Sequence, residues 1–258
     1  MIKLFRNIRK KLLNENKTQR YFKYAIGEII LVVIGILIAL QINTWNENRK
    51  AENEEVKILK ALKADLKVSK NRLNETMLMQ QKVLAYSAIL INIHEKQDEK
   101  EFEYFDKNLD SLSDLIGYGT SWYRAEPITG AYNALISAGK IDLIHNENLR
   151  HILAQFAADL ESGFEDQQSA MDLLTILTTQ NSSFSLKIAR NEFRDRLGLK
   201  SRSYDALLVS KNFFNDDQYF GNLYNKTTHE GNRLSRQKSM FNQIDSILHI
   251  INKELNKK

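Results

Sequence analysis

Residues 29–40 form an uninterrupted run of twelve apolar residues, IILVVIGILIAL. The apolar stretch extends from Ala25 to Ile42, where only Glu28 and Gln41 interrupt it. As a helix it measures about 27 Å, close to the roughly 30 Å of a bilayer's hydrocarbon core. This length and apolarity predict a membrane-spanning helix. A buried core helix and a cleaved signal peptide are the alternatives.

Aromatic residues flank the apolar stretch on both sides, as expected of side chains at the two membrane interfaces. Tyr21, Phe22 and Tyr24 precede the stretch, and Trp45 follows it. The exit at residues 39–43 reads ALQIN, which is not a small-x-small cleavage site. The pattern therefore favours a retained signal anchor over a cleaved signal peptide.

Basic residues are concentrated before the apolar stretch. The first 23 residues hold eight basic residues and one acidic residue, whereas residues 43–65 hold five basic residues. Because Lys and Arg are retained on the cytoplasmic side, we expect a cytoplasmic tail over 1–23, a membrane helix over 24–45 and an exported domain over 46–258. In a bacterium with two membranes that domain is periplasmic.

The tail also has an amphipathic pattern. Its apolar residues recur at helical spacing among the basic ones: Ile2, Phe5, Ile8, Leu12 and Leu13. This pattern is typical of a helix lying on anionic membrane lipid, and the alternative is that the charges only set topology. With the tail's charge removed, residues 46–258 have a net charge of −1, which argues against nucleic acid as their partner.

Glu28 is an ionisable residue inside the predicted span, where such groups are costly and usually contact protein or water. It shares one helix face with Gly35 and Ala39, whose small side chains permit close helix packing. Glu28, Gly35 and Ala39 are therefore a candidate contact with a second copy or a partner membrane protein. The alternative is that Glu28 lies at the interface and pairs with Lys23 or Arg20.

Two motifs resemble a bacterial family of single-span membrane proteins whose domain has no known function. The first is AIGE…GILIALQIN…WNE over residues 25–47, and the second is PITGAY at 127–132, followed by LISAGKIDLI at 135–144. The resemblance implies a short basic tail, one span and a helical remainder. It implies no activity and supplies no catalytic residues.

The remainder of the chain has helical periodicity. One proline and ten glycines in 258 residues favour long helices over many strands. One repeat at threes and fours predicts a helix of roughly 45 residues with a coiled-coil-like face; its positions are Leu59, Leu62, Leu66, Ser69, Leu73, Thr76, Gln80, Val83, Ser87 and Leu90. Because this seam contains polar residues, we expect it to pack against later helices.

We therefore expect an all-α fold, in which a transmembrane helix continues into an elongated bundle of about five to seven helices. The expected elements after the long helix are a second helix over 102–116, a loop at 117–121, a helix from 125–127 to Gly139, a helix capped by Asn146, an irregular region at 181–203 and a final helix from Asp216 or Asp217 to about Leu255. Asn212–Asn215 is expected to be core.

The best candidate binding site is the segment Gly117–Glu126, because loops rich in aromatic and arginine residues are frequent at binding surfaces. Its candidate residues are Tyr118, Trp122, Tyr123, Arg124 and Glu126. The alternative is that the aromatic side chains close one end of the bundle.

No catalytic or metal site is expected. The chain has no cysteine, no HExxH zinc motif, no P-loop and no G-x-S-x-G motif. We expect no cofactor and a non-enzymatic envelope protein that binds itself or partners. A sensor-like module that binds a small ligand and signals through a partner membrane protein is the alternative, and a hydrolase with a scattered active site is a third.

Overall fold

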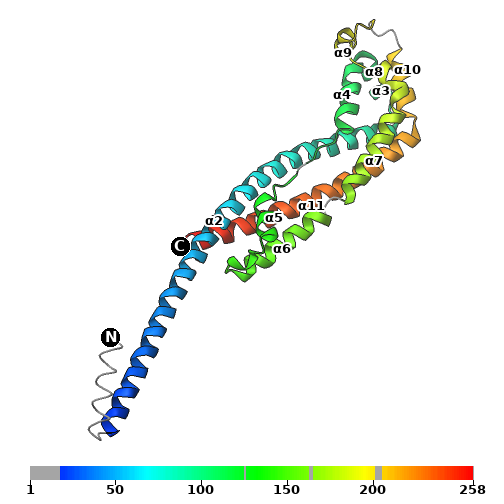
Figure 1. Ribbon diagram of the computed structural model, residues 1–258. Coiled ribbons are helices and arrows are strands. Elements are labelled where there is room, and N and C mark those ends of the chain that lie inside the picture. The colour runs from blue at the N-terminus through cyan, green and yellow to red at the C-terminus, as the bar shows by residue number, and fades with distance from the viewer. Residues whose placement is uncertain (1–17, 125, 163–164, 201–204, 258) are drawn as a thin grey trace. The chain divides into compact units, whose positions relative to one another are not determined.

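The structure is a computed structural model that describes residues 18–124, 126–162, 165–200 and 205–257. Every regular element in these ranges is helical, which confirms the all-α prediction (Figure 1). The elements are α2 (Thr18–Lys96), α3 (Glu99–Lys107), α4 (Leu109–Gly119), α5 (Gly130–Ser137), the 3-10 helix η1 (Ile141–Leu143), α6 (Glu147–Ser162), α7 (Glu165–Gln180), α8 (Ser182–Ile188), α9 (Asn191–Arg196), α10 (Ala206–Phe214) and α11 (Asp217–Leu255). The described chain thus has more helices than predicted.

The chain divides into two compact units, Met1–Lys57 and Ile58–Lys258. Helix α2 contributes residues to both. In the first unit the residues of its apolar stretch, 25–42, are exposed within the described protein, except for Ala25 and Glu28, which are half-buried. The amphipathic tail predicted at Ile2–Leu13 lies outside the described residues.

In the second unit the predicted seam of α2 is buried at all ten positions, from Leu59 to Leu90. It packs against α11, which runs antiparallel to it. Leu59 shares a hydrophobic cluster with Ile251, whereas Leu90 shares another with Phe220. Helix α11 alone has 39 residues, about 58 Å of helix, so the bundle is elongated as predicted.

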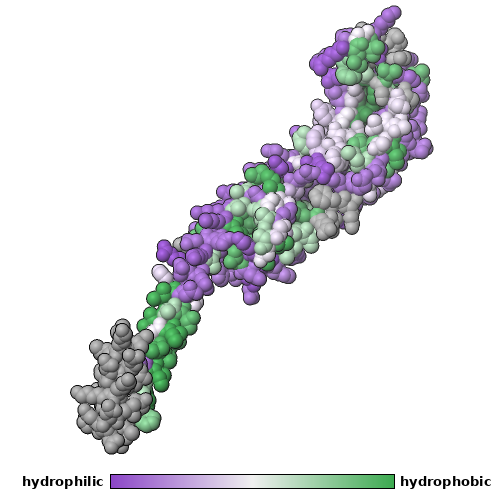
Figure 2. Space-filling model, in the orientation of Figure 1, coloured by the Kyte–Doolittle hydropathy of each residue, from purple (hydrophilic) through white to green (hydrophobic). Residues whose placement is uncertain are grey.

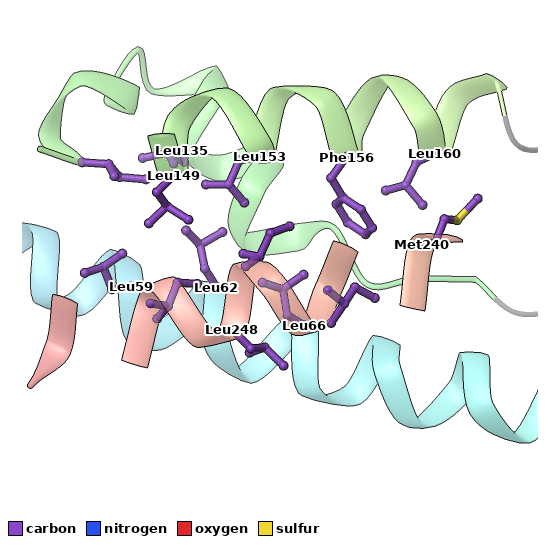
Figure 3. Packing of buried hydrophobic residues seen from close by; sticks show 14 of the residues in the cluster. Leu59, Leu62, Leu66, Leu135, Leu149, Leu153, Phe156, Leu160, Met240 and Leu248 are labelled. Atoms are coloured by element: carbon purple, nitrogen blue, oxygen red, sulfur yellow. The ribbon is translucent and has the colours of Figure 1, made fainter. Parts of the chain in front are cut away.

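The two hydrophobic clusters differ in composition. The first is mainly aliphatic, and in Figure 3 the side chains of α6 point toward leucines of α2 and toward α11. The second joins α3, α4 and α10 to the start of α11 and is rich in phenylalanine. Phe213 and Phe214 are fully buried there, which confirms the core prediction for these two residues of Asn212–Asn215, whereas the two asparagines are exposed.

Several predicted helix ends are confirmed. The side chain of Asn146 accepts a hydrogen bond of 2.9 Å from the backbone N–H of Leu149 and caps α6. Asp216 caps α11 in the same way, through the N–H of Tyr219. Gly139 follows α5 with a φ of 64°, a conformation that glycine adopts without strain.

Other predicted boundaries are wrong. The predicted helix over 102–116 is two helices separated at Asn108, and α4 continues through Gly119, so residues 117–119 are helical rather than a loop. Residues 181–203 contain α8 and α9 instead of an irregular region. Helix α8 is held in place because Ile188 is buried in the second cluster and Phe184 packs against that cluster.

Helix α5 begins at Gly130, not at 125–127. The reason is tertiary: Asp65 of α2 accepts a hydrogen bond of 2.8 Å from the N–H of Ala131, in the first turn of α5. Ser69 accepts another, of 2.7 Å, from the N–H of Ile128. Side chains of α2 thus satisfy the donors at and before this helix start, and Pro127 precedes the helix without beginning it.

Candidate functional site

The predicted binding loop begins later than expected, because Tyr118 lies in the last turn of α4. Its exposed ring stacks on Tyr86 of α2, with 5.0 Å between ring centroids. Trp122 and Tyr123 follow in an extended segment and are half-buried, whereas Arg124 and Glu126 are exposed and form an ion pair with each other. The structure therefore brings four of the five candidate residues together and places Tyr118 on a helix.

A buried ionic network lies beneath this segment, on α11. Lys226, Glu230 and Arg233 are spaced four and three residues apart, so they share one helix face. Their side chains are only 0%, 1% and 2% exposed. Arg233 Nη1 lies 2.7 Å from Glu230 Oε2, and Lys226 Nζ lies 3.5 Å from Glu230 Oε1. We call Lys226, Glu230, Arg233 and Gln80 the buried network.

Gln80, on the seam of α2, joins the network from the opposite helix. Its amide Nε2 donates to Glu230 Oε2 at 2.6 Å and to the Glu230 carbonyl oxygen at 3.2 Å. The presence of glutamine at position 80 of the seam is thus explained, because a leucine here would leave the Glu230 carboxylate without this donor.

The two cations of the network hold the candidate loop by its backbone. Lys226 Nζ donates to the carbonyl oxygen of Ser121 at 2.9 Å, and Arg233 Nη2 donates to that of Tyr123 at 2.8 Å. The guanidinium of Arg233 also lies over the Trp122 ring, 5.2 Å from its centroid. Residues 121–123 are therefore fixed to α11, whereas the side chains of Arg124 and Glu126 are exposed.

The electrostatics of the network are unbalanced, since two cations surround one carboxylate. Burial lowers the pKa of Lys226, and the charge of Glu230 opposes that shift. Burial also lowers the pKa of Arg233, again opposed by Glu230. Such networks contribute little net stability but penalise any packing that separates their members. The network therefore specifies the register of α2 on α11 and the position of the loop.

An open pocket of about 460 Å³ lies beside the loop. Its lining is polar: Arg72, Glu75 and Thr76 from α2, with Arg124 and Glu126 from the loop. Arg72 Nη1 donates to the carbonyl oxygen of Glu126 at 3.5 Å. Two guanidinium groups and two carboxylates in one pocket suit a small ligand that carries both charges. In the described ranges no group of three or more His, Asp or Glu residues could hold a metal ion.

The candidate face of the span is open within the described protein. Gly35 has no atom within 4 Å of the position that a Cβ would take, and Ala39 is exposed. Glu28 is half-buried on the same helix. The structure places these three residues as the spacing predicts, and the contact with a second helix stays a prediction.

The sequence pattern does not predict the buried network. Charged residues at helical spacing usually form a solvated face, and Lys226, Glu230 and Arg233 fit that description. One signal was available: the final helix has a gap in its apolar pattern between Leu223 and Met240, where Leu234 is the one aliphatic residue. The buried face of α11 continues through that gap with polar residues.

A family of unknown function, DUF6090, has a model that matches residues 28–159, about half of the chain. The chain belongs to this family. The match covers most of the apolar stretch, the buried seam, the candidate loop and α5, and ends within α6. No curated protein and no solved structure matches the chain.

Proposed function

We propose that this member of DUF6090 is a membrane-anchored, non-enzymatic envelope protein whose helical domain binds a protein partner or a second copy of itself. The observation that carries the proposal is the exposure of the apolar stretch. Among the described residues one helix is long and apolar enough to cross a membrane, and none of its most apolar window is buried (Figure 2). A core helix of a soluble protein would be covered by its own domain.

The orientation rests on charge. Eight basic residues precede the apolar stretch, so the N-terminus stays in the cytoplasm and the helical domain is exported. The stretch acts as a signal anchor in the inner membrane of a bacterium, and the domain lies in the periplasm.

The binding role rests on the candidate loop. Its backbone is held by buried cations, and it presents Arg124 and Glu126 at the surface. Preorganised surface loops with aromatic and arginine side chains are suited to protein recognition, because little conformational entropy is lost on binding. A second contact through Glu28, Gly35 and Ala39 joins copies or partner spans within the membrane.

A photo-cross-linking amino acid in place of Arg124, used in intact membranes, tests this proposal. We expect a discrete cross-linked product with a second polypeptide. The matched control carries the same amino acid in place of Tyr224, an exposed residue of α11. Monomer alone from both positions contradicts the binding role.

The second candidate function is a sensor-like domain that binds a small ligand and signals through a partner membrane protein. The pocket lined by Arg72 and Arg124 favours it. A panel of amino acids and dipeptides, screened by thermal shift on the detergent-solubilised full chain, tests this function. A shift that Arg72→Gln removes supports the sensor, whereas a flat panel together with a cross-linked partner favours the protein-binding role.

A further inference from the structure

Four large apolar side chains project into solvent within a short segment of the second unit. They are Leu186, Phe193, Leu197 and Leu199, which are 60%, 57%, 59% and 40% exposed. We call residues 186–200 the tip. In Figure 1 its helix α9 stands at the end of the domain near α3, α8 and α10. An exposed apolar patch of this density on a soluble surface marks a contact site.

The tip is an ordered structure. Arg194 donates from Nε to the carbonyl oxygen of Lys200 and from Nη1 to that of Leu186, both at 2.8 Å. Gly198, with a φ of 67°, ends α9, and the N–H of Leu199 returns to the carbonyl oxygen of Arg194 at 3.0 Å. One arginine therefore holds both ends of the tip, and the four apolar side chains named above remain exposed.

The tip is also strongly basic. It holds five basic residues and two acidic ones, against a net charge of −1 for residues 46–258. The basic residues are Lys187, Arg190, Arg194, Arg196 and Lys200. Arg190 pairs with Asp114 and Arg196 with Glu192, whereas no ion pair with a described carboxylate is found for Lys187, Arg194 or Lys200. Along the tip, the exposed apolar residues thus alternate with Lys187, Arg194 and Lys200, whose positive charges are not paired with a described carboxylate.

We propose that the tip docks on a lipid surface that carries anionic headgroups. Phenylalanine and leucine enter the boundary between headgroups and acyl chains, while lysine and arginine remain at the level of the phosphates. A second copy of the tip is a poor occupant because the two tips repel each other. A lipid surface accepts projecting side chains at any spacing, whereas a protein partner must supply a matching pocket for each.

The test uses the full chain in nanodiscs of phosphatidylcholine, mixed with sucrose-loaded vesicles that are then sedimented. One set of vesicles is phosphatidylcholine alone, and the other contains equal parts of phosphatidylcholine and phosphatidylglycerol. We expect the protein to sediment with the anionic vesicles only, and less so as salt is raised. Sedimentation with neither set, or equally with both, overturns the proposal.

The basic N-terminal tail of the same chain is a competing source of anionic-lipid binding, so the tip needs its own variant. Phe193→Ser combined with Leu197→Ser is expected to weaken vesicle binding about tenfold or more, because both side chains lose their apolar contact with the lipid. The control is Leu78→Ser with Tyr224→Ser, which removes two equally exposed apolar residues from α2 and α11. Retained binding in the tip variant assigns the lipid contact to the tail and overturns the proposal. Self-association that the tip variant loses, without vesicle binding, overturns it in favour of a second copy.

Discussion

Helix α2 contains two stretches with opposite relations between hydropathy and burial. Residues 25–42 are almost wholly apolar and are exposed within the protein. Residues 59–90 form a seam that includes Ser69, Thr76, Gln80 and Ser87, and that seam is buried. The more apolar stretch is therefore the one that the protein itself does not cover.

This difference shows that the two stretches are built for different surroundings. Three polar residues of the seam form specific hydrogen bonds: Ser69 with the N–H of Ile128, Gln80 with Glu230, and Ser87 with the carbonyl oxygen of Gly119. The apolar side chains of residues 25–42 cannot form such hydrogen bonds, and they need a surrounding that demands none. A lipid bilayer supplies that, because a helix satisfies its own backbone and apolar side chains need no donor.

The largest expected effect comes from charging the apolar stretch. Ile34→Lys with Ile38→Lys places two cations at its middle, each costing about 2.5–3.5 kcal/mol in a membrane. We expect the protein to leave the alkali-resistant membrane fraction, measured by immunoblotting of fractionated cells. The matched control, Val68→Lys with Ile89→Lys, charges exposed positions of the second stretch and should stay in the membrane. Equal loss of both variants would remove the distinction between the stretches.

The buried network should show the next largest effect. Glu230→Gln leaves Lys226 and Arg233 as uncompensated buried cations, which costs about 3–5 kcal/mol. For a domain of this size the loss lowers Tm by about 10 °C, as measured by circular dichroism of the solubilised protein. Glu95→Gln, at an exposed position of α2, is the control and should leave Tm unchanged. An unchanged Tm for Glu230→Gln would mean that the polar seam does not depend on this carboxylate.

Two glycines of α4 offer a sharper test of how closely the seam packs. At Gly119 an added Cβ would lie 2.8 Å from Leu90 Cδ1 and 3.3 Å from the backbone nitrogen of Ser87, so Gly119→Ala requires the Leu90 side chain to move and α4 to shift slightly on α2. We expect a loss of about 1–3 kcal/mol in the free energy of unfolding. At Gly117 an added Cβ meets nothing within 4 Å, and Gly117→Ala should stabilise the helix by about 0.5–1 kcal/mol. Denaturant unfolding of both variants measures the contrast, and changes of the same sign would contradict it.

The smallest effect is expected outside the seam, at Asp166 of α7. A hydrogen bond from His229, aided by the charge of Arg236, holds the pKa of this carboxyl below its usual value of 3.8. A lowered pKa stabilises the fold above the unfolded pKa, and that stability is lost as pH falls through the folded pKa. Asp166→Asn should therefore unfold at a lower Tm than the unmodified protein at neutral pH, and the gap should close below about pH 4. A difference in Tm that persists below about pH 4 would mean that Asp166 stabilises the fold through something other than its charge.

The sequence predicts the parts of this fold that depend on local pattern. The apolar stretch, the ten buried positions from Leu59 to Leu90, and the caps at Asn146 and Asp216 each follow from spacing and residue type. The parts that it misses depend on contacts between distant residues. Helix α5 begins where Asp65 and Ser69 receive its backbone donors, and no residue near 125–130 signals that boundary.

The candidate site divides in the same way. The aromatic and arginine residues between Tyr118 and Glu126 predicted the loop. They did not predict that charged residues are buried beneath it. Lys226 and Arg233 are buried only because the carbonyl oxygens of Ser121 and Tyr123 and the carboxylate of Glu230 are available to them. A residue pattern alone does not distinguish such charges from solvated ones, since burial is a property of the assembled helices.

The central claim, that residues 25–42 cross a membrane with the N-terminus in the cytoplasm, has a direct test because the chain has no cysteine. Asn14→Cys and Asn46→Cys introduce single thiols before and after the stretch, for labelling with a membrane-impermeant maleimide. In cells whose outer membrane is permeabilised, the account predicts labelling at position 46 and none at position 14 until the inner membrane is lysed. Labelling of position 14 before the inner membrane is lysed, with or without labelling of position 46, would contradict it.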